Sequence, residues 1–145
     1  MIRACQTSDI EPVLSIWLAA SIQAHDFIEP GFWESKLDDM RHLYLPASDT
    51  RVMEVSGRVV GFYSLYENTL AAIFVQPRLQ GQGLGTALLD DAKNRRANLQ
   101  LTVYARNAPS IHFYRQHGFV TAGEQLDEHT GEPELVMQWP SACLR

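Results

Sequence analysis

The sequence predicts a mixed α/β fold, and three observations carry that prediction. Short runs rich in β-branched and aromatic residues alternate with stretches whose apolar residues recur at helical spacing. Glycine, proline and asparagine stand at the boundaries between these segments. The length of 145 residues suits one domain with a sizeable core. We therefore expect a single domain over residues 1–145, with the element order β-α-α-β-β-β-α-β-α-β-β.

The first third of the chain predicts a short strand over residues 2–5 and then a helix. Ser8 offers an N-cap and Glu11 follows three residues later, which is the spacing of a capping box. Pro12 is tolerated because an N–H in the first turn of a helix has no intrahelical acceptor, so the N–H that proline lacks is not needed. The apolar residues that follow at helical spacing are Val13, Ile16, Trp17 and Ala20.

A second helix is expected to begin near Pro30, since proline suits a first turn. Pro46 stands just beyond its expected end. Its apolar stripe comprises Trp33, Leu37, Met40 and Tyr44.

The middle of the chain predicts three strands joined by tight turns. Residues 51–55 and 58–66 flank the turn Ser56-Gly57, and Glu67-Asn68 predicts the next turn. The apolar run 69–75, which ends before Pro77, predicts a strand buried on both faces.

The second half predicts two helices and three strands. One helix spans about 83–96, with Leu84, Leu88 and Ala92 facing inward, and Gly118 is suited to end the other. The remaining expected elements are a strand over 99–104, a helix over 108–116, and a hairpin of 119–126 and 134–139 around Thr130-Gly131.

Composition and charge narrow the classes of function. The formal net charge of −5 argues against a nucleic-acid partner, which requires a basic face. No apolar run approaches the roughly 18 residues of a membrane span, and the start lacks the apolar core of a secretory signal, so we expect a cytoplasmic protein. Cys5 and Cys143 lie at opposite ends and predict free thiols. The spacing of histidines and cysteines predicts no metal site.

Three glycines at alternate positions, Gly81, Gly83 and Gly85, separate the predicted buried strand from a predicted helix. A helix N-terminus attracts anions, and missing Cβ atoms let an anion reach the backbone, which favours a phosphate or pyrophosphate site. The alternative is a tight turn without a ligand. The P-loop pattern is absent, and the dinucleotide pattern fails because Thr86 stands where a third glycine is needed.

Two blocks of the sequence resemble the GNAT superfamily of acyl-CoA-dependent N-acyltransferases. Residues 80–85, Gln-Gly-Gln-Gly-Leu-Gly, resemble its Q/R-x-x-G-x-G/A signature, and residues 107–119 resemble its N-x-x-A/S-x-x-F-Y-x-x-x-G-F block. A narrower likeness to small bacterial acetyltransferases lies in Ser21, residues 25–28 and Phe32-Trp33. The resemblance implies a twisted, mostly antiparallel sheet with a central parallel strand pair, flanked by helices.

The resemblance also implies acetyl-CoA as co-substrate, without a metal. Backbone amides from Gln82 to Thr86 would hold the pyrophosphate, and the ends of strands 73–75 and 102–104 would splay apart. The pantetheine arm would pair with free backbone at Phe74 and Val75, and exposed backbone at Phe74 would polarise the thioester carbonyl. Asn107 would bond a pantetheine amide, or serve as a helix cap, or do both. The implied cofactor-binding residues are Ile73, Phe74, Val75, Gly81, Gln82, Gly83, Leu84, Gly85, Thr86 and Asn107.

Tyr114 is the first catalytic candidate, because a phenol can donate a proton to the leaving thiolate. The alternative is that it only packs on a helix face. Many relatives carry a glutamate base where this chain has Thr69. Glu67, acting through water, and His25 are therefore the candidate bases, although an exposed hairpin residue and a helix-end residue would fit the same positions.

The acceptor is expected to approach between the aromatic segment 25–33 and the acidic segment 126–134, a pairing that suits a cationic amine. The acidic residues are Asp127, Glu128, Glu132 and Glu134. The predicted activity is direct transfer of acetyl to a primary amine of a small molecule, peptide or protein, in a ternary complex. The alternatives are a non-catalytic acyl-CoA-binding or sensor module and a nucleotide-binding domain. The chain is expected to be a monomer or a homodimer.

Overall fold

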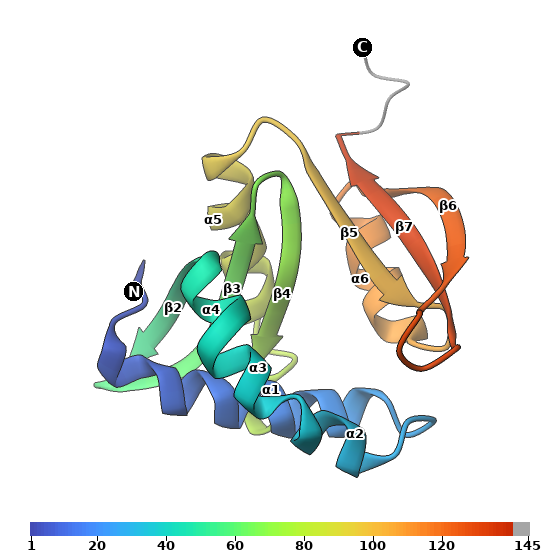
Figure 1. Cartoon of the computed structure of the whole chain (residues 1–145). Helices are drawn as coiled ribbons and strands as arrows, with labels where there is room; N and C mark the ends of the chain where they lie inside the picture. Colours follow the sequence, from blue (N-terminus) through green and yellow to red (C-terminus); the bar gives the residue numbers. More distant parts are fainter. Residues whose placement is uncertain (141–145) are drawn as a thin grey trace.

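The computed structural model describes residues 1–140, so Cys143 lies outside the described residues. One sheet with the strand order β1-β2-β3-β4-β5-β7-β6 forms the centre of the molecule (Figure 1). Its neighbouring strands run antiparallel except β4 and β5, which confirms the predicted sheet. The strands are β1 (Ile2–Ala4), β2 (Asp49–Val55), β3 (Arg58–Tyr66), β4 (Thr69–Val75), β5 (Leu99–Tyr104), β6 (Val120–Leu126) and β7 (Pro133–Trp139).

The parallel pair is joined at one end only. Thr69 of β4 pairs with Gln100 of β5, and the Gln100 N–H donates to the Asn68 carbonyl at 2.9 Å. Beyond this point the two strands diverge, so the predicted splay is confirmed (Figure 1). The prediction that β4 is buried on both faces is wrong, because the strand borders this opening and leaves Ala71 exposed.

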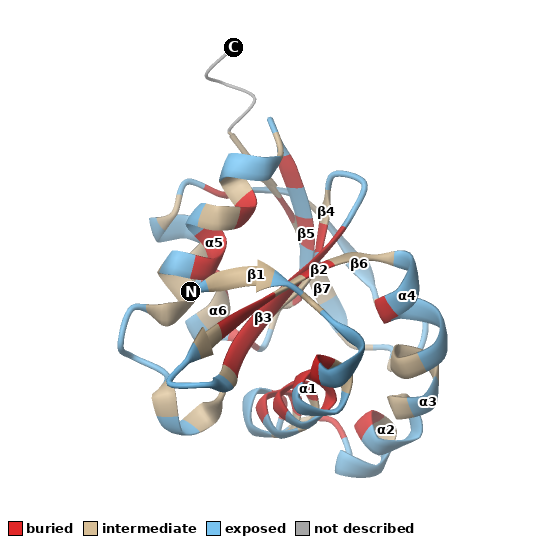
Figure 2. Ribbon diagram, turned by 90° about the vertical axis from the view of Figure 1, so that its left-hand side faces the viewer, coloured by how far each residue is buried: buried red, intermediate tan, exposed pale blue. Residues whose placement is uncertain are grey.

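Helices cover both faces of the sheet. Figure 2 shows α1 to α4 on one side and α5 and α6 on the other. Each side has its own apolar core, built around Phe62 and Trp17 on the first face and around Tyr63 and Leu88 on the second. The helices are η1 (Thr7–Asp9), α1 (Ile10–Ala24), α2 (Pro30–Ser35), α3 (Leu37–Asp39), η2 (Met40–Tyr44), α4 (Leu45–Ala47), η3 (Pro77–Leu79), α5 (Leu84–Arg95) and α6 (Ala108–Gln116).

The start of the first helix differs from the prediction. Ser8 lies inside the short turn η1, and the cap is made by Asp9, whose carboxylate accepts from the Gln6 N–H at 2.7 Å. Arg3 donates to the same carboxylate at 2.7 Å. This partly buried ion pair fixes Asp9 at the helix start, so the predicted capping box of Ser8 and Glu11 is wrong.

The second helical segment begins at Pro30 as predicted but is not one helix. It breaks at Lys36 and widens into the π-helical turn η2, where the Leu45 N–H donates to the Met40 carbonyl. Pro46 lies inside α4 and not beyond the end of the segment. Because Pro46 has no N–H, the ordinary helical bond to position 42 cannot form, which accounts for the wider turn. Tyr44, expected on the buried stripe, is 53% exposed.

The strand β5 and the helix α6 have the predicted bounds, and α5 differs from its prediction by one residue at each end. Gly118 ends α6 with φ +91°, as expected for a residue after a helix. None of the helices within residues 1–140 combines the length and apolar character needed to span a membrane.

Candidate active site

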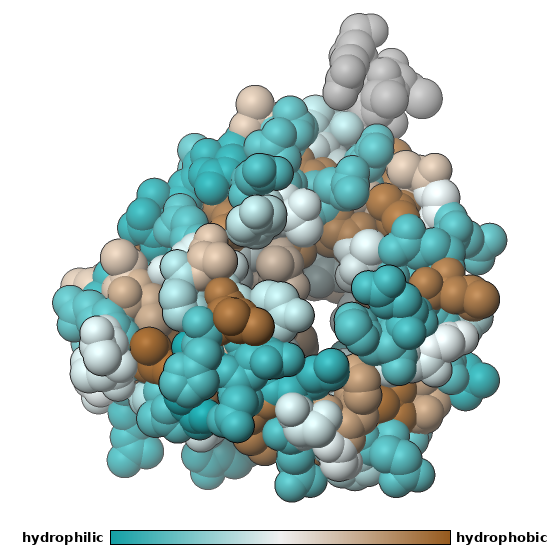
Figure 3. Space-filling view, viewed as in Figure 1, coloured by the Kyte–Doolittle hydropathy of each residue, from teal (hydrophilic) through white to brown (hydrophobic). Residues whose placement is uncertain are grey.

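Two cavities meet at the opening between β4 and β5. The glycine-loop cavity, of about 810 Å³, lies over the end of β4, residues 79–86 and the start of α6. The aromatic cavity, of about 530 Å³, lies between α1, α2, the divergent strands and the β6–β7 hairpin. Figure 3 shows the surface hollowed between the helical side and the hairpin side of the molecule. The wall residues common to both cavities are Ile73, Phe74, Asn107, Ser110 and Tyr114.

Glycine is favoured at the three loop positions for two different physical causes. Gly81 and Gly83 adopt φ values of +82° and +84°, which other residues rarely take. A Cβ at either position would meet no atom within 4 Å, so both face open space. Gly85 lies within α5, where a Cβ would contact the Phe113 ring at 3.6 Å. The loop is therefore a bare, curved backbone in front of a helix start.

The amides of this loop are available to a ligand. The first backbone bond of α5 runs from the Ala87 N–H to the Gly83 carbonyl at 3.2 Å. Within residues 1–140, the N–H groups from Gly81 to Thr86 have no acceptor. Unpaired amides at a helix N-terminus form an anion site, and the open space beside Gly81 and Gly83 admits one. The arrangement fits the pyrophosphate of a coenzyme.

The backbone of β4 that faces the opening belongs to Ile73 and Val75. The Gln76 N–H donates to the Val60 carbonyl at 2.8 Å, and antiparallel pairs alternate, so Phe74 bonds to Phe62 of β3. The expectation of exposed backbone at Phe74 is therefore wrong. The Val75 carbonyl accepts from the Gln80 side-chain amide at 3.2 Å. The Ile73 backbone and the Val75 N–H remain directed toward the opening.

Tyr114 lies on α6 where the two cavities meet. Its ring packs against those of Phe113 and Phe119, at centroid distances of 5.5 and 5.6 Å. Its hydroxyl makes no hydrogen bond to any part of residues 1–140. Desolvation raises the pKa of Tyr114, so the phenol keeps its proton throughout the neutral range. The Tyr114 ring therefore packs on its neighbours while the residue also lines the junction of the two cavities. Its protonated hydroxyl is a proton donor at that junction.

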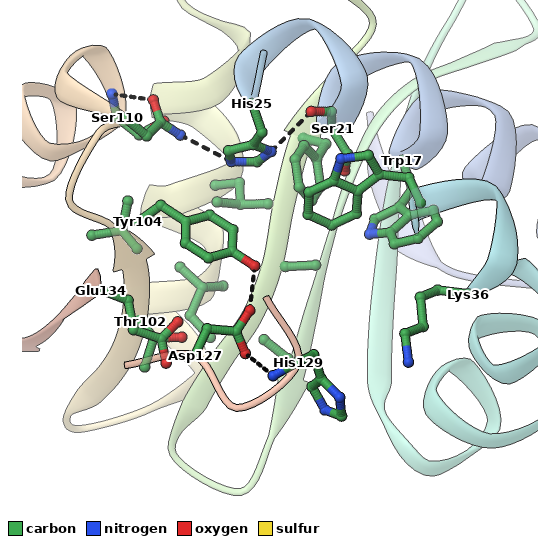
Figure 4. Close-up of a pocket in the computed structure, with 18 of the residues that line it drawn as sticks. Trp17, Ser21, His25, Lys36, Thr102, Tyr104, Ser110, Asp127, His129 and Glu134 are labelled. Carbon is green, nitrogen blue, oxygen red and sulfur yellow. Dashed lines mark hydrogen bonds between the residues drawn. The ribbon is translucent and has the colours of Figure 1, made fainter. Parts of the chain in front are cut away.

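His25 and Asn107, both predicted as site residues, belong to one hydrogen-bonded chain (Figure 4). The Ser21 carbonyl lies 2.9 Å from Nδ1 of His25, which assigns the proton to that nitrogen. Nε2 then accepts from the Asn107 amide at 3.4 Å, while the Asn107 oxygen accepts from the Ser110 N–H at 3.3 Å. Asn107 is therefore the predicted N-cap of α6, and His25 orients its side chain.

The surroundings of His25 keep the imidazole neutral. It stacks on Trp33 at 5.1 Å and meets the edge of Tyr104 at 5.1 Å. Burial lowers the pKa of His25, outweighing the hydrogen bond to Ser21 that raises it. Since both ring nitrogens already have partners, the arrangement favours a positioning role over that of a base.

We expect this histidine to make stability depend on pH. Its pKa is lowered on folding, so the unfolded chain binds the proton more readily, and the free energy of unfolding falls as pH drops below about 6.5. The expected slope is at most about 1.4 kcal/mol per pH unit. Urea unfolding between pH 7.5 and 5.0 measures this slope, because most carboxylates titrate below that pH range. His25→Gln should flatten the slope, whereas His112→Gln, which removes an exposed imidazole, should not. Equal slopes in all three proteins would contradict the assignment.

Glu67 does not reach the site. It lies in the β3–β4 turn with φ +53°, exposed, and lines neither cavity. Its carbonyl accepts from Arg96 at 2.7 Å. Glu67 precedes Thr69 by two residues, so on a continuous strand both side chains would lie on one face, but the left-handed turn breaks that continuity. Glu67 is therefore wrong as a candidate base.

The acceptor side carries two carboxylates, from Asp127 and Glu134. Asp127 accepts from the Tyr104 hydroxyl at 2.6 Å (Figure 4). It also accepts from the Thr130 hydroxyl at 2.8 Å. Burial raises the pKa of Asp127, but the hydrogen bonds from the Tyr104 and Thr130 hydroxyls and the His129 N–H, together with the nearby His129 side chain, lower it by more, so the group is ionised at neutral pH. Glu134 accepts from Gln125 at 2.7 Å.

The other two acidic residues predicted for this rim do not line the cavity. The Glu128 side chain is 88% exposed, and Glu132 pairs with Arg106 at 3.2 Å. Sequence reasoning missed Tyr104, which holds Asp127, and Lys36, which lines the opposite wall. Tyr104 could have been noticed, because a polar side chain at the end of a divergent strand faces the opening.

Comparison with known proteins identifies the family. Residues 46–121 match the family described as acetyltransferase (GNAT) domain. The chain is 35% identical over 141 residues to the peptidyl-lysine N-acetyltransferase YiaC of Escherichia coli, covering 97% of each protein. It is 26% identical to the peptidyl-lysine N-acetyltransferase YjaB of Salmonella typhimurium, covering 91% of each.

Solved structures of other proteins share the fold of this chain. The solution structure of apo-form YjaB from Escherichia coli has a TM-score of 0.85 and 26% identity, covering 98% of each chain. The PaiA N-acetyltransferase of Thermoplasma acidophilum, in complex with coenzyme A, shares the fold, with a TM-score of 0.78 at 16% identity over 95% of this chain and 96% of that one. With the amide-lined loop and Tyr114 at the junction, these relationships place the chain in the GNAT family, as an acetyl-CoA-dependent N-acetyltransferase.

Proposed function

We propose that the protein acetylates the ε-amine of lysine residues in peptides or proteins. The observation that carries this proposal is the junction at Tyr114, where the cavity over the unpaired loop amides adjoins a cavity with two carboxylates. The 35% identity to a protein named as a peptidyl-lysine N-acetyltransferase supports it. Residues of one chain line both cavities.

The residues of the glycine-loop cavity fit acetyl-CoA, which supplies a thioester-activated acetyl group when bound. Amides from Gln82 to Thr86 would hold its pyrophosphate. The backbone of Ile73 and the Val75 N–H would pair with the pantetheine amides, as an added strand. Asn107 keeps one amide hydrogen beyond the bond to His25 and can donate it to the same arm.

Transfer is proposed to be direct, in a ternary complex. The cavities share their walls, so an amine on one side can reach a thioester on the other. Cys5, the one cysteine within residues 1–140, lines neither cavity, and no acyl-enzyme is required. Tyr114 donates its phenolic proton toward the leaving sulfur. One proton of the ammonium passes to solvent before the attack, because Glu67 is remote and Nε2 of His25 already accepts from Asn107. As the C–S bond breaks, the nitrogen of the new amide loses a second proton, which restores the Tyr114 phenol.

Product analysis tests this assignment. The purified protein is incubated with acetyl-CoA and three acceptors: a peptide with one internal lysine and a blocked N-terminus, the same peptide with arginine in place of lysine and a free N-terminus, and a small diamine. Release of CoA gives the rate, and fragment masses locate the acetyl group. We expect the lysine peptide to be preferred by kcat/KM. Preference for the free N-terminus or the diamine would overturn the proposal.

The carboxylate of Asp127 is expected to attract the substrate ammonium. Asp127→Asn keeps the shape of the side chain and removes its charge, so KM for the lysine peptide should rise about tenfold, an order expected for a partly buried charge pair. Initial rates over a range of peptide concentrations measure this. Glu128→Gln removes one charge from the same loop, outside the cavity, and should leave KM within about twofold. An equal rise in KM in the two variants would mean that Asp127 acts only through the overall negative charge of the surface, and not by binding the ammonium.

A further inference from the structure

A third cavity adjoins the acceptor side and has no role in the proposed chemistry. This side-chain cavity, of about 530 Å³, lies between the helical segment η2–α4 and the β3–β4 hairpin. Leu43 and Leu45 face it from the helices, and Tyr66 and Thr69 face it from the hairpin. None of the residues that line it is charged. Its chemistry is therefore opposite to that of the acidic wall at Asp127.

The side-chain cavity continues the aromatic cavity. Both are lined by Trp17, Met40, Tyr44, Ala71 and Ala72. The two alanines leave room where larger side chains would close the passage. Ala71 is the extra residue of a β-bulge, since Ser64 pairs with Ala72 and Leu65 pairs with Leu70. A bulge beside a site redirects a strand, and here it opens the wall that separates the cavities.

The helical wall of this cavity is held open by the irregular turn around Pro46. The π-helical η2 leaves Leu43 and Tyr44 59% and 53% exposed, and Tyr66 on the facing hairpin is 53% exposed. Figure 3 shows apolar surface over this helical segment, among hydrophilic neighbours. Apolar side chains gathered at one opening indicate a contact surface more than isolated ones do.

The two serine hydroxyls in the cavity wall already have hydrogen-bond partners. The Ser48 hydroxyl donates to the Tyr44 carbonyl at 2.7 Å, and the Ser64 hydroxyl bonds to Thr50 at 2.8 Å. A charged occupant would lose hydration without a partner of opposite charge, because no lining residue is charged, whereas the leucines and aromatic rings of the wall suit an apolar one. The occupant that fits is an apolar side chain.

We propose that this cavity binds an apolar side chain within two residues of the target lysine, and so selects the substrate sequence. The inference rests on the proposed function. An extended peptide advances about 3.3 Å per residue, so a side chain one or two positions from the lysine can reach a cavity that shares walls with the acceptor site. Leu43 and Tyr66, on opposite walls, are the residues that set this preference.

A peptide series tests the subsite. Peptides with one internal lysine and a blocked N-terminus carry leucine in turn at each position from two before to two after the lysine, with alanine elsewhere. We expect leucine at one of these positions to raise kcat/KM about tenfold or more over the all-alanine peptide. The leucine-to-alanine ratio, measured within each protein, is the readout, because it cancels changes in the chemical step.

Variants locate the effect. Leu43→Lys places a charge at an exposed wall position and should bring the ratio close to one, and Tyr66→Lys should do the same from the other wall. Val55→Lys is the matched control, because Val55 is 46% exposed on β2 and lines none of the three cavities, and its ratio should equal that of the unmodified protein.

The possible outcomes separate the subsite from the proposed function. A ratio near one at every position, with lysine peptides still acetylated, overturns the subsite alone. Transfer to other amines but to no lysine peptide overturns both. A ratio that Leu43→Lys and Tyr66→Lys leave unchanged also overturns the subsite. Sedimentation provides a further check: if these variants alter the mass of the particle and not the ratio, the face joins copies of the chain.

Discussion

Replacing Tyr114 by phenylalanine is expected to lower kcat about a hundredfold or more while leaving the Kd for acetyl-CoA within about twofold. The size follows from the usual contribution of a positioned general acid. The ring would still pack against Phe113 and Phe119, so the walls of both cavities are retained. Only the proton donor at the junction is removed. Release of CoA at saturating peptide measures kcat, and calorimetric titration measures Kd.

The pH dependence of the unmodified protein gives the same hypothesis a second test. Because desolvation raises the pKa of Tyr114 above the ordinary phenol value near 10, activity should not decline on the alkaline side below about pH 10 on account of this group. An alkaline decline well below that value, absent in Tyr114→Phe, would contradict a protonated, desolvated phenol.

Tyr63→Phe is the matched control for the loss of a hydroxyl. The Tyr63 hydroxyl donates to Asp91 and accepts from Arg95 at 3.1 Å, on the face of the sheet covered by α5 and outside both cavities. Its removal should cost about 1 kcal/mol of stability and leave kcat unchanged. If Tyr114→Phe retained kcat within twofold, or if both variants lost it equally, Tyr114 would have no role in proton transfer.

Elements with local signals were predictable from the sequence. Asn107 caps α6, and Gly118 ends it, so those bounds needed no tertiary information. The segment after Pro30 had no such local signal. The missing N–H of Pro46 explains the wider turn, but that the helix continues through Pro46 and does not end before it depends on tertiary contacts, here those of η2 with α1 and the burial of Leu45. The periodicity of the apolar residues alone therefore predicted one straight helix after Pro30, with an apolar stripe that extended too far, to Tyr44.

The candidate site divides in the same way. The glycine loop and Tyr114 stand in contiguous motifs, so their place was predictable. The errors at Phe74 and Glu67 arose from pairing and turn geometry: which backbone groups are free depends on the register with β3, and a left-handed turn residue cannot be placed by counting along a strand. The Tyr104–Asp127 contact joins residues 23 apart in the chain and has no local signal.

Gly83→Ala is expected to weaken binding of coenzyme A at least about tenfold. The added Cβ would point into open space beside the unpaired amides, where the phosphate oxygens must approach. The substitution also strains the backbone, since φ is +84°, and should lower stability by about 1–2 kcal/mol without any ligand. A valine here would add β-branching to this strain and obscure the effect on binding.

Gly57→Ala separates the two effects. Gly57 lies in the β2–β3 turn with φ +78°, and its Cβ would also meet no atom within 4 Å, so the strain is matched without a neighbouring ligand. Coenzyme A at a hundredfold excess over its Kd should stabilise the unmodified protein and Gly57→Ala by about 2.7 kcal/mol. At that concentration Gly83→Ala should gain at least about 1.3 kcal/mol less, because each tenfold loss of affinity removes about 1.4 kcal/mol of binding free energy. Chemical unfolding with and without coenzyme A measures the difference. Equal stabilisation of all three proteins would mean that the bare amides beside Gly83 do not hold the diphosphate, and the assignment of the glycine-loop cavity would then fail.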